Sequence, residues 1–409
     1  MIAGTRELAV LGGQSAFAEP LHVGAPSTGN RERLLERING ALDRRWLTND
    51  GPLVRELEQR IEALLGVRHC IAMCNGTVAL EIGIRALGLE GEVIVPSMTF
   101  VATAHSLQWQ RITPVFADID PGTHNIAVEH IEELITPRTT GIIGVHLWGR
   151  PCDVDALADL AGRHDLRLLY DAAHAFAVTL GGRGIGSFGD LEVFSFHATK
   201  FFNTFEGGAI TTNDDDLAGR LRLMRNFGFA GYDHVVYVGT NGKMNEISAA
   251  MGLTLLDDLD NLIEHNRSNH RLYRECLAGV PGLAVQGFDE AERQNYQYVV
   301  VDVSAGDAGL SRDQLLEVLW RENVHARRYF FPGCHRMEPY RSLDPDAGVR
   351  LPNTEALLER LLMLPSGGAV GASEVHTICG ILADAVRRAD EVRASLGSMR
   401  VPGYYLGDV

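Results

Sequence analysis

Lysine is almost absent from this chain: of its 37 Lys and Arg residues only two, Lys200 and Lys243, are lysines. Arginine supplies nearly every positive charge, so a retained lysine invites a chemical explanation. Unlike arginine, lysine can lose its proton and attack a carbonyl carbon. Lys200 ends the segment Ser195–Lys200, at the close of an apolar run typical of a β-strand. On its own, this residue is equally well explained as a solvated lysine in a chain that otherwise uses arginine.

The chain also has few cysteines, no long apolar run and a deficit of positive charge. Its net charge of −16 argues against broad binding to nucleic acids or anionic membranes. None of its six cysteines forms a C-x-x-C pair, which favours reduced thiols over a disulfide framework. No apolar stretch approaches the length that crosses a bilayer. We expect a cytoplasmic protein with no nucleic-acid or membrane partner, and its His and Cys spacings predict no metal site.

At 409 residues the chain is long enough for two domains. From about residue 54 to 265, strand-like and helix-like segments alternate, which predicts an α/β domain with a mostly parallel sheet covered by helices on both faces. The expected strands are Cys70–Met73, Glu92–Val95, Thr113–Ala117, Gly141–Leu147, Leu166–Tyr170, Leu191–Phe196 and Gly208–Thr212. The expected helices are Val54–Leu65, Thr77–Gly88, Val128–Leu134, Val154–His164 and Asp215–Asn226.

After Asn241 the pattern predicts fewer strands and more helices, as in a smaller α+β domain. The elements expected there are one long helix over Asn245–Leu277, a strand over Tyr296–Val303, and helices over Asp313–Glu322, Thr354–Leu361 and Ser373–Ser395. We therefore divide the chain into an N-terminal segment (1–45) that packs on the small domain or on a partner subunit, a large domain (46–265) and a small C-terminal domain (266–409).

Polar residues suited to binding a ligand lie near the ends of the predicted strands. Gly76 and Thr77 open a helix directly after a strand, and a helix N-terminus offers free N–H groups and a positive dipole end to a phosphate. Asp171 ends an apolar strand, at the edge where parallel sheets gather ligand groups. Taken singly, each has a plainer explanation as part of an ordinary helix cap.

An amine at Lys200, a carboxylate at Asp171 and a phosphate-binding helix end together match the needs of pyridoxal phosphate (PLP). The PLP aldehyde forms a Schiff base with an amine, and a carboxylate keeps its ring nitrogen protonated so that the ring accepts electrons. His174 can hydrogen-bond the ring oxygen, although alone it is as well explained as a surface histidine. Ser195 can donate to the phosphate. Once a substrate amine displaces Lys200, the freed lysine can move a proton.

One glycine motif points elsewhere. Gly184, Gly186 and Gly189 match the dinucleotide-binding pattern G-x-G-x-x-G. However, they lie between a turn-rich stretch and a strand, whereas that pattern works between a strand and a helix. The sequence therefore favours a glycine-rich hairpin over a nicotinamide site.

The motifs resemble those of the DegT/DnrJ/EryC1/StrS family of PLP-dependent sugar aminotransferases over nearly the whole chain. The matching segments are Trp46–Pro52, Asn75–Leu80, Pro96–Phe100, Asp171–Ala175, Ser195–Lys200, Glu206–Gly208 and Asn241–Glu246. The resemblance implies the PLP-dependent transferase fold of type I (aspartate aminotransferase-like) and an obligate homodimer with shared active sites. Two departures, Phe205 in place of a glycine and His197 at a variable position, lie where they can reshape the substrate pocket.

Carried over residue by residue, the resemblance implies Lys200 as the catalytic, Schiff-base lysine and Asp171 as the partner of the ring nitrogen. The other cofactor-binding positions that it implies are Gly76, Thr77 and Ser195 at the phosphate, Phe100 stacked on the ring, His174 near the ring hydroxyl, and Asn241 at the phosphate of the neighbouring subunit. Family members that dehydrate their substrate carry His in place of the lysine, so Lys200 argues for transamination.

Within the family, Val145–Cys152 and Tyr329–His335 are most similar to enzymes that make dTDP-4-amino-4,6-dideoxy-D-glucose from the 4-keto-6-deoxy sugar nucleotide. The resemblance implies L-glutamate as the amino donor, a ping-pong mechanism and a role in deoxyaminosugar biosynthesis of secondary metabolism. Candidate substrate contacts are Lys243 (from the partner subunit), Arg327, Arg328, Tyr329, Phe330 and His335. The alternatives are an aminotransferase for a 3-keto sugar nucleotide or a cyclitol ketone, a PLP-dependent dehydratase or lyase, and a non-catalytic PLP-binding regulator.

Overall fold

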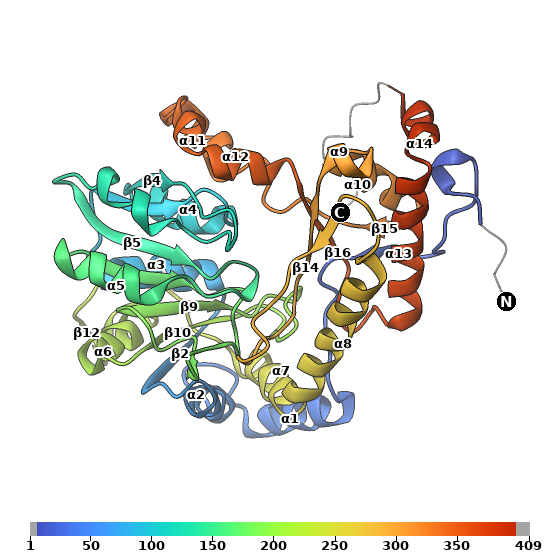
Figure 1. Cartoon of the computed structure of the whole chain (residues 1–409). Coiled ribbons are helices and arrows are strands. Elements are labelled where there is room, and N and C mark those ends of the chain that lie inside the picture. The colour runs from blue at the N-terminus through green and yellow to red at the C-terminus, as the bar shows by residue number, and fades with distance from the viewer. Residues whose placement is uncertain (1–5, 398–409) are drawn as a thin grey trace.

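The computed structural model describes residues 6–397, and a seven-stranded sheet forms the centre of its larger part (Figure 1). The strand order is β2-β10-β9-β6-β5-β3-β4, and only the two pairs that involve β10 are antiparallel. The strands are β2 (His69–Met73), β3 (Glu92–Pro96), β4 (Thr113–Ala117), β5 (Thr139–Val145), β6 (Arg167–Asp171), β9 (Leu191–Ser195) and β10 (Gly208–Thr212). The mostly parallel sheet is confirmed, with all seven predicted strands present.

Helices cover both faces of this sheet. Side chains alternate along each strand, so that in β2 Cys70 and Ala72 join one apolar layer while Ile71 and Met73 join the other. The first layer packs under α2 (Pro52–Leu65), α5 (Val154–Arg163) and α7 (Glu246–Leu256), and the second under α3 (Gly76–Ala86), α4 (Val101–Gln108) and α6 (Asp215–Met224). A strand covered on both faces must be apolar at every position, which is why the sequence showed unbroken apolar runs.

Three helix predictions were wrong. The single helix predicted over Ser373–Ser395 is two helices, α13 (Ala372–Arg387) and α14 (Ala389–Leu396), separated at Arg388. The long helix over 245–277 is two helices, α7 and α8 (Leu259–Leu277), separated at Asp257 and Asp258. Aspartate side chains compete with the helical backbone for hydrogen bonds, which favours a helix end at this pair. The segment 128–134 forms two short 3-10 turns, η2 (Val128–His130) and η3 (Glu132–Leu134). A segment this short does not repay the cost of nucleating an α-helix.

A second, smaller part of the molecule lies to the right of the large sheet in Figure 1, where β14, β16, α8 and α13 are labelled. Its antiparallel sheet contains β13 (Leu283–Val285), β14 (Val299–Val303) and β16 (Leu361–Leu364). Around it pack α8, α10 (Arg312–Arg321), α13 (Ala372–Arg387) and α14 (Ala389–Leu396). The α+β character predicted for this part is confirmed, while the exact domain boundaries at 45 and 265 remain a prediction.

The N-terminal segment contacts both parts of the molecule. Leu8 and Val10 are buried in the core of the smaller part, and β1 (Leu21–His22) pairs in parallel with β15 (Val324–His325). By contrast, α1 (Arg31–Arg44) packs against α7. The segment therefore crosses from one part to the other.

Short elements complete the described chain. They are η1 (Ala9–Leu11), η4 (Leu147–Gly149), β7 (Thr179–Leu180), β8 (Arg183–Gly184), β11 (Phe229–Gly231), β12 (His234–Val235), α9 (Ala305–Ala308), η5 (Cys334–Arg336), α11 (Tyr340–Leu343), η6 (Ala347–Arg350) and α12 (Pro352–Leu358). The glycine motif over 184–189 includes β8 of the small β7–β8 hairpin, as predicted. Over residues 6–397, no helix combines the length and apolar character needed to cross a membrane.

Candidate active site

A cavity of about 310 Å³ opens where the carboxyl ends of β6 and β9 meet the N-terminus of α3. This is the edge at which parallel sheets gather ligand groups. Nine of the residues predicted from the sequence line it: Gly76, Thr77, Phe100, Asp171, His174, Ser195, Lys200, Tyr329 and Phe330. Tyr329 and Phe330 follow β15, so both the large and the small part of the molecule contribute to the cavity wall.

Lys200 presents its amine to this cavity. Its Nζ donates a hydrogen bond of 3.2 Å to the hydroxyl oxygen of Tyr298. Burial lowers the pKa of Lys200 to about 8, although the nearby carboxylate of Asp171 favours the charged form. A lysine with this pKa is partly neutral near physiological pH, as a nucleophile or a base must be.

Asp171 is a buried carboxylate held by neutral donors. The hydroxyl of Thr103 donates to its Oδ2 at 2.8 Å, and the backbone N–H of Ala173 donates to its Oδ1 at 3.1 Å. Burial raises the pKa of Asp171, while these two hydrogen bonds and the charge of Lys200 oppose that rise. Among the described residues no cationic side chain hydrogen-bonds this carboxylate, so a protonated ring nitrogen would supply the opposite charge that burial demands. The site fits PLP at this point.

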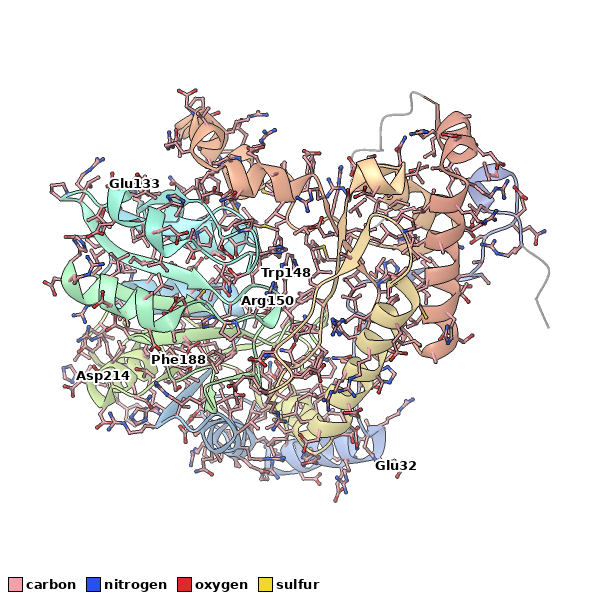
Figure 2. All side chains as sticks on the ribbon, in the orientation of Figure 1. Glu32, Glu133, Trp148, Arg150, Phe188 and Asp214 are labelled. Carbon is pink, nitrogen blue, oxygen red and sulfur yellow. The ribbon has the colours of Figure 1, made fainter. Side chains whose placement is uncertain are left out.

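The protonation of His174 follows from its contacts. Its Nδ1 accepts a hydrogen bond of 3.3 Å from the backbone N–H of Trp148, and burial beside Lys200 keeps the pKa of the ring well below its ordinary value. The imidazole is therefore neutral, with its proton on Nε2, which is a donor suited to a ring oxygen. The side chain of Trp148 lies where the large sheet faces the small one (Figure 2), and its ring stacks on those of His174 and Phe330.

The N-terminus of α3 leaves room for a phosphate. Its cap residue Asn75 accepts a hydrogen bond from the backbone N–H of Val78. The N–H groups of Gly76 and Thr77 come earlier in the helix and take no part in this hydrogen bond. A Cβ atom added to Gly76 would lie 3.1 Å from the Cβ of Ser195, tighter than ordinary contact. Only glycine keeps this space open, so the position suits close approach of a phosphate to the backbone.

Three predicted substrate contacts lie outside the cavity wall. Arg328 forms an ion pair of 3.1 Å with Asp313, and the guanidinium of Arg327 lies 5.0 Å from the ring centre of Tyr329. His335 is only 3% exposed. Its two ring nitrogens lie 2.6 Å from Ser97 Oγ and 2.6 Å from Glu355 Oε1, so its polar atoms are engaged within the protein.

Asn241 and Lys243 also lie away from the Lys200 cavity. They form isolated bridges to Asn226 and Met73 respectively, and Lys243 Nζ donates to Asn226 Oδ1 at 2.9 Å. Lys243 lines a second cavity of about 440 Å³, which shares no lining residue with the Lys200 cavity. The structure does not bring these two residues together with the Lys200 of the same chain.

Sequence reasoning missed Tyr298 and Thr103. Tyr298 lies within a predicted strand, and no pattern indicated that its hydroxyl meets a lysine 98 residues earlier in the chain. Thr103 follows Thr99 by four residues, the spacing of about one helical turn, and the two hydroxyls lie 2.8 Å apart. That spacing is a visible signal, but hydroxyls one turn apart are common and do not by themselves indicate a carboxylate partner.

Comparison with known proteins agrees with this geometry. Residues 29–383 match the DegT/DnrJ/EryC1/StrS aminotransferase family. A dTDP-4-amino-4,6-dideoxy-D-glucose transaminase of Shigella dysenteriae is 38% identical over 347 residues, covering 85% of this chain and 94% of the relative. A GDP-perosamine synthase of Caulobacter vibrioides is 37% identical over 365 residues, covering 84% and 96%.

The solved structures lead to the same family. The crystal structure of DesI in the presence of its TDP-sugar product is 49% identical and superposes with a TM-score of 0.89, covering 95% of this chain and 98% of DesI. The predicted fold class, an α/β PLP-dependent transferase, is thereby confirmed. The chain belongs to the DegT/DnrJ/EryC1/StrS family of sugar aminotransferases, and its cofactor is pyridoxal phosphate.

Proposed function

We propose that this enzyme transfers the amino group of L-glutamate to dTDP-4-keto-6-deoxy-D-glucose and so makes dTDP-4-amino-4,6-dideoxy-D-glucose (EC 2.6.1.33). The observation that carries most weight is the 49% identity to DesI, whose crystal structure was analysed in the presence of its TDP-sugar product. The Shigella relative, named for this same product, adds to it. The reaction runs in two halves: glutamate gives up its amino group and leaves as 2-oxoglutarate, and the keto sugar then takes the amine.

Each of the residues around the cavity has a separate role in the proposed reaction. When bound, PLP supplies an aldehyde that bonds amines and a ring that withdraws electrons from the bond being broken. Lys200 would hold the cofactor covalently and, once released, would move a proton as a neutral amine. Asp171 would keep a proton on the ring nitrogen, and His174 would donate its Nε2–H to the ring oxygen. Phe100 would cover one side of the ring.

The phosphate is assigned to the helix end at Gly76 and Thr77 together with Ser195. All three residues line the cavity, and the close approach between Gly76 and Ser195 leaves space that a side chain would fill. A helix N-terminus provides N–H donors and a favourable dipole for an anion. A chain with a net charge of −16 needs such local donors to hold a phosphate.

We also propose a homodimer in which Asn241 and Lys243 of one subunit complete the site of the other. Both residues lie away from the cavity of their own chain, which supports a role at a neighbour's site. Several large apolar side chains are also exposed, and exposed apolar surface is typical of interfaces where such side chains adjoin. They include Trp46, Leu47, Phe100, Phe205, Phe227, Phe229, Tyr232, Val235, Val236, Tyr237 and Val238.

A second candidate substrate is a GDP-linked 4-keto sugar. The GDP-perosamine synthase of Caulobacter vibrioides matches at 37% identity, close to the 38% of the dTDP-sugar enzyme from Shigella. The cavity residues that hold the cofactor do not distinguish the two, because the nucleotide and the keto position are set by other contacts. A 3-keto sugar nucleotide, a cyclitol ketone and a dehydration reaction remain as further alternatives.

A substrate panel tests these proposals. The purified protein is incubated with L-glutamate and either dTDP-4-keto-6-deoxy-D-glucose or its GDP-linked counterpart, and the amine product is identified by mass spectrometry and NMR. We expect amination of the dTDP sugar, with 2-oxoglutarate released in equal amount and no product from Lys200→Ala. Preferential amination of the GDP sugar would reverse the assignment, and product formation without any amino donor would indicate a dehydratase.

The cellular location proposed is the cytoplasm. All six cysteines are free thiols. Free thiols are typical of proteins in a reducing compartment. Fractionation of cells that make the protein, with detection of the enzyme in the cytoplasmic fraction, checks this proposal.

A further inference from the structure

Tyr298 connects the small sheet to the lysine of the large one. The residue directly precedes β14, and its hydroxyl oxygen accepts the 3.2 Å hydrogen bond from Lys200 Nζ. Its ring lies 4.6 Å from that of His174 and 5.5 Å from that of Trp148, so neighbouring aromatic rings fix its position. Tyr298 is 8% exposed and lines the cavity, which places its hydroxyl inside the reaction space and not in bulk solvent.

The hydroxyl of Tyr298 stays protonated under working conditions. Burial raises its pKa well above the ordinary value for tyrosine. A neutral phenol can accept one hydrogen bond and donate another. Lys200 in its neutral form donates one N–H to Tyr298, so this hydrogen bond does not use the lone pair of the amine. The pair is therefore arranged as a base and the group that orients it.

We propose that Tyr298 is a positioning residue that holds the ε-amine of Lys200 in place for proton transfer whenever this amine is not bonded to the cofactor. The inference rests on the proposed function, because it assumes that Lys200 moves the proton. In the amino-donor half, the donor Cα–H bond breaks and its proton forms a new N–H bond at Lys200, while bound PLP would take up the electron pair. Lys200 would then give this proton to the carbon that carried the PLP aldehyde, and it ends neutral again.

Geometry explains why the hydroxyl matters for rate. A lysine side chain has four rotatable carbon–carbon bonds, and an unanchored amine samples many positions. Misplacing a catalytic group by about 1 Å can cost about 100-fold in rate. Trp148 and His174 hold the ring of Tyr298, and Tyr298 in turn anchors Nζ, so a rigid aromatic group limits where the base can go.

The test compares Tyr298→Phe with wild type and with Tyr170→Phe. Phenylalanine keeps the ring and removes only the hydroxyl. Tyr170 is a matched control because it is fully buried in β6, lines no part of the Lys200 cavity, and its hydroxyl has no hydrogen-bond partner among the described residues. Single-turnover rates of the amino-donor half are followed by the absorbance of the bound cofactor, with the donor carrying either hydrogen or deuterium at Cα.

We expect Tyr298→Phe to slow this half-reaction by about 10- to 100-fold, with a larger deuterium isotope effect than wild type, because proton transfer becomes more rate-limiting. Cofactor affinity, measured by equilibrium dialysis, and the thermal midpoint of the holoenzyme should change little, and Tyr170→Phe should match wild type. An unchanged rate and isotope effect in Tyr298→Phe would overturn the proposal. So would a rate loss that cofactor saturation restores, since it would reduce the role of Tyr298 to cofactor binding.

The same experiment separates this inference from the choice of donor. The assay uses whichever amino acid converts the wild-type cofactor, and L-glutamate is expected to do so. If another amino acid does so instead, the donor assignment fails while the comparison of Tyr298→Phe with wild type still decides the role of Tyr298.

Discussion

The hydroxyl of Thr103 donates a 2.8 Å hydrogen bond to Oδ2 of Asp171. Because an ionised carboxylate only accepts, the direction of this bond is determined, and Thr99 must then donate to Thr103 across their own 2.8 Å contact. Thr99 and Thr103 are 2% and 0% exposed, so water does not substitute for either hydroxyl. The chain of two threonines thus stabilises the charged form of a carboxylate that burial would otherwise neutralise.

Thr103→Val should weaken the charged form of Asp171. Removing the donor raises the pKa of the carboxyl further, so Asp171 holds the ring-nitrogen proton less firmly. Loss of one hydrogen bond to the charged form raises the pKa of the Asp171 carboxyl by roughly one unit, and we expect turnover to fall about tenfold. Steady-state kinetics and cofactor affinity measure the effect, with Thr103→Ser, which keeps the hydroxyl, as the control. Equal damage in both variants would show that packing, not the hydroxyl, is what matters.

Lys200→Met should stabilise the cofactor-free protein at neutral pH. The pKa of Lys200 is about 8 when folded, against an ordinary value of 10.5, so burial disfavours its protonated form. Between these values the unfolded chain binds more protons than the folded chain, and wild-type stability rises with pH. The gain in stability of Lys200→Met over wild type should therefore be largest below these two pKa values. It should vanish as the pH rises from the folded to the ordinary pKa. Urea unfolding of both proteins below, between and above these two pKa values checks this sign.

Arg327→Ala should raise the KM for the sugar nucleotide. The guanidinium of Arg327 lies over the ring of Tyr329, which lines the cavity, so it is a candidate for the substrate diphosphate. A hydrogen bond to a charged group contributes about 1.5–3 kcal/mol, which corresponds to about 10- to 150-fold in KM. The glutamate half-reaction should be unaffected in a single-turnover assay. Comparable loss in both half-reactions would remove Arg327 from the substrate site.

Two inactive variants should restore activity when mixed, if the active sites are shared. Lys200→Ala and Asn241→Ala remove groups that the proposal assigns to different chains at one site. A mixed dimer then keeps one intact site, and random exchange of subunits yields about a quarter of wild-type activity. The control pairs Lys200→Ala with Asp171→Asn, whose residues belong to the same chain, and should recover nothing. Mixed dimers are obtained by co-expression of the two variants. If neither mixture recovers activity, Asn241 does not contribute to the neighbouring site.

The sequence predicted those parts of the fold and site that depend on local patterns. Unbroken apolar runs identified the strands of the large sheet, because helices cover both of its faces. Lys200 and Asp171 were predicted since each ends or follows such a strand, where ligand groups gather. Tyr298 was missed because it meets Lys200 across 98 residues of chain, and no local pattern specifies a contact between two sheets. His335 resembled a substrate contact by its position in a motif, yet the structure buries it between Ser97 and Glu355.

Gly76→Ala should lower cofactor affinity without unfolding the protein. The added Cβ would lie 3.1 Å from Ser195 Cβ and 3.3 Å from Ser195 Cα, in the space that the phosphate is proposed to occupy. Overpacking costs roughly 1–3 kcal/mol, which corresponds to about 5- to 150-fold in affinity if it falls on the bound state. Fluorescence titration with PLP measures this loss.

Gly162→Ala is the matched control for that substitution. Gly162 lies within α5, and a Cβ added there meets nothing within 4 Å. Replacing glycine by alanine inside a helix should stabilise the protein by about 0.5–1 kcal/mol and leave PLP affinity unchanged. If Gly76→Ala binds PLP as wild type does while Gly162→Ala behaves as expected, the phosphate does not lie against Gly76. The assignment of the α3 N-terminus to the phosphate would then have to be abandoned, because Gly76 is the residue whose missing side chain keeps that space open.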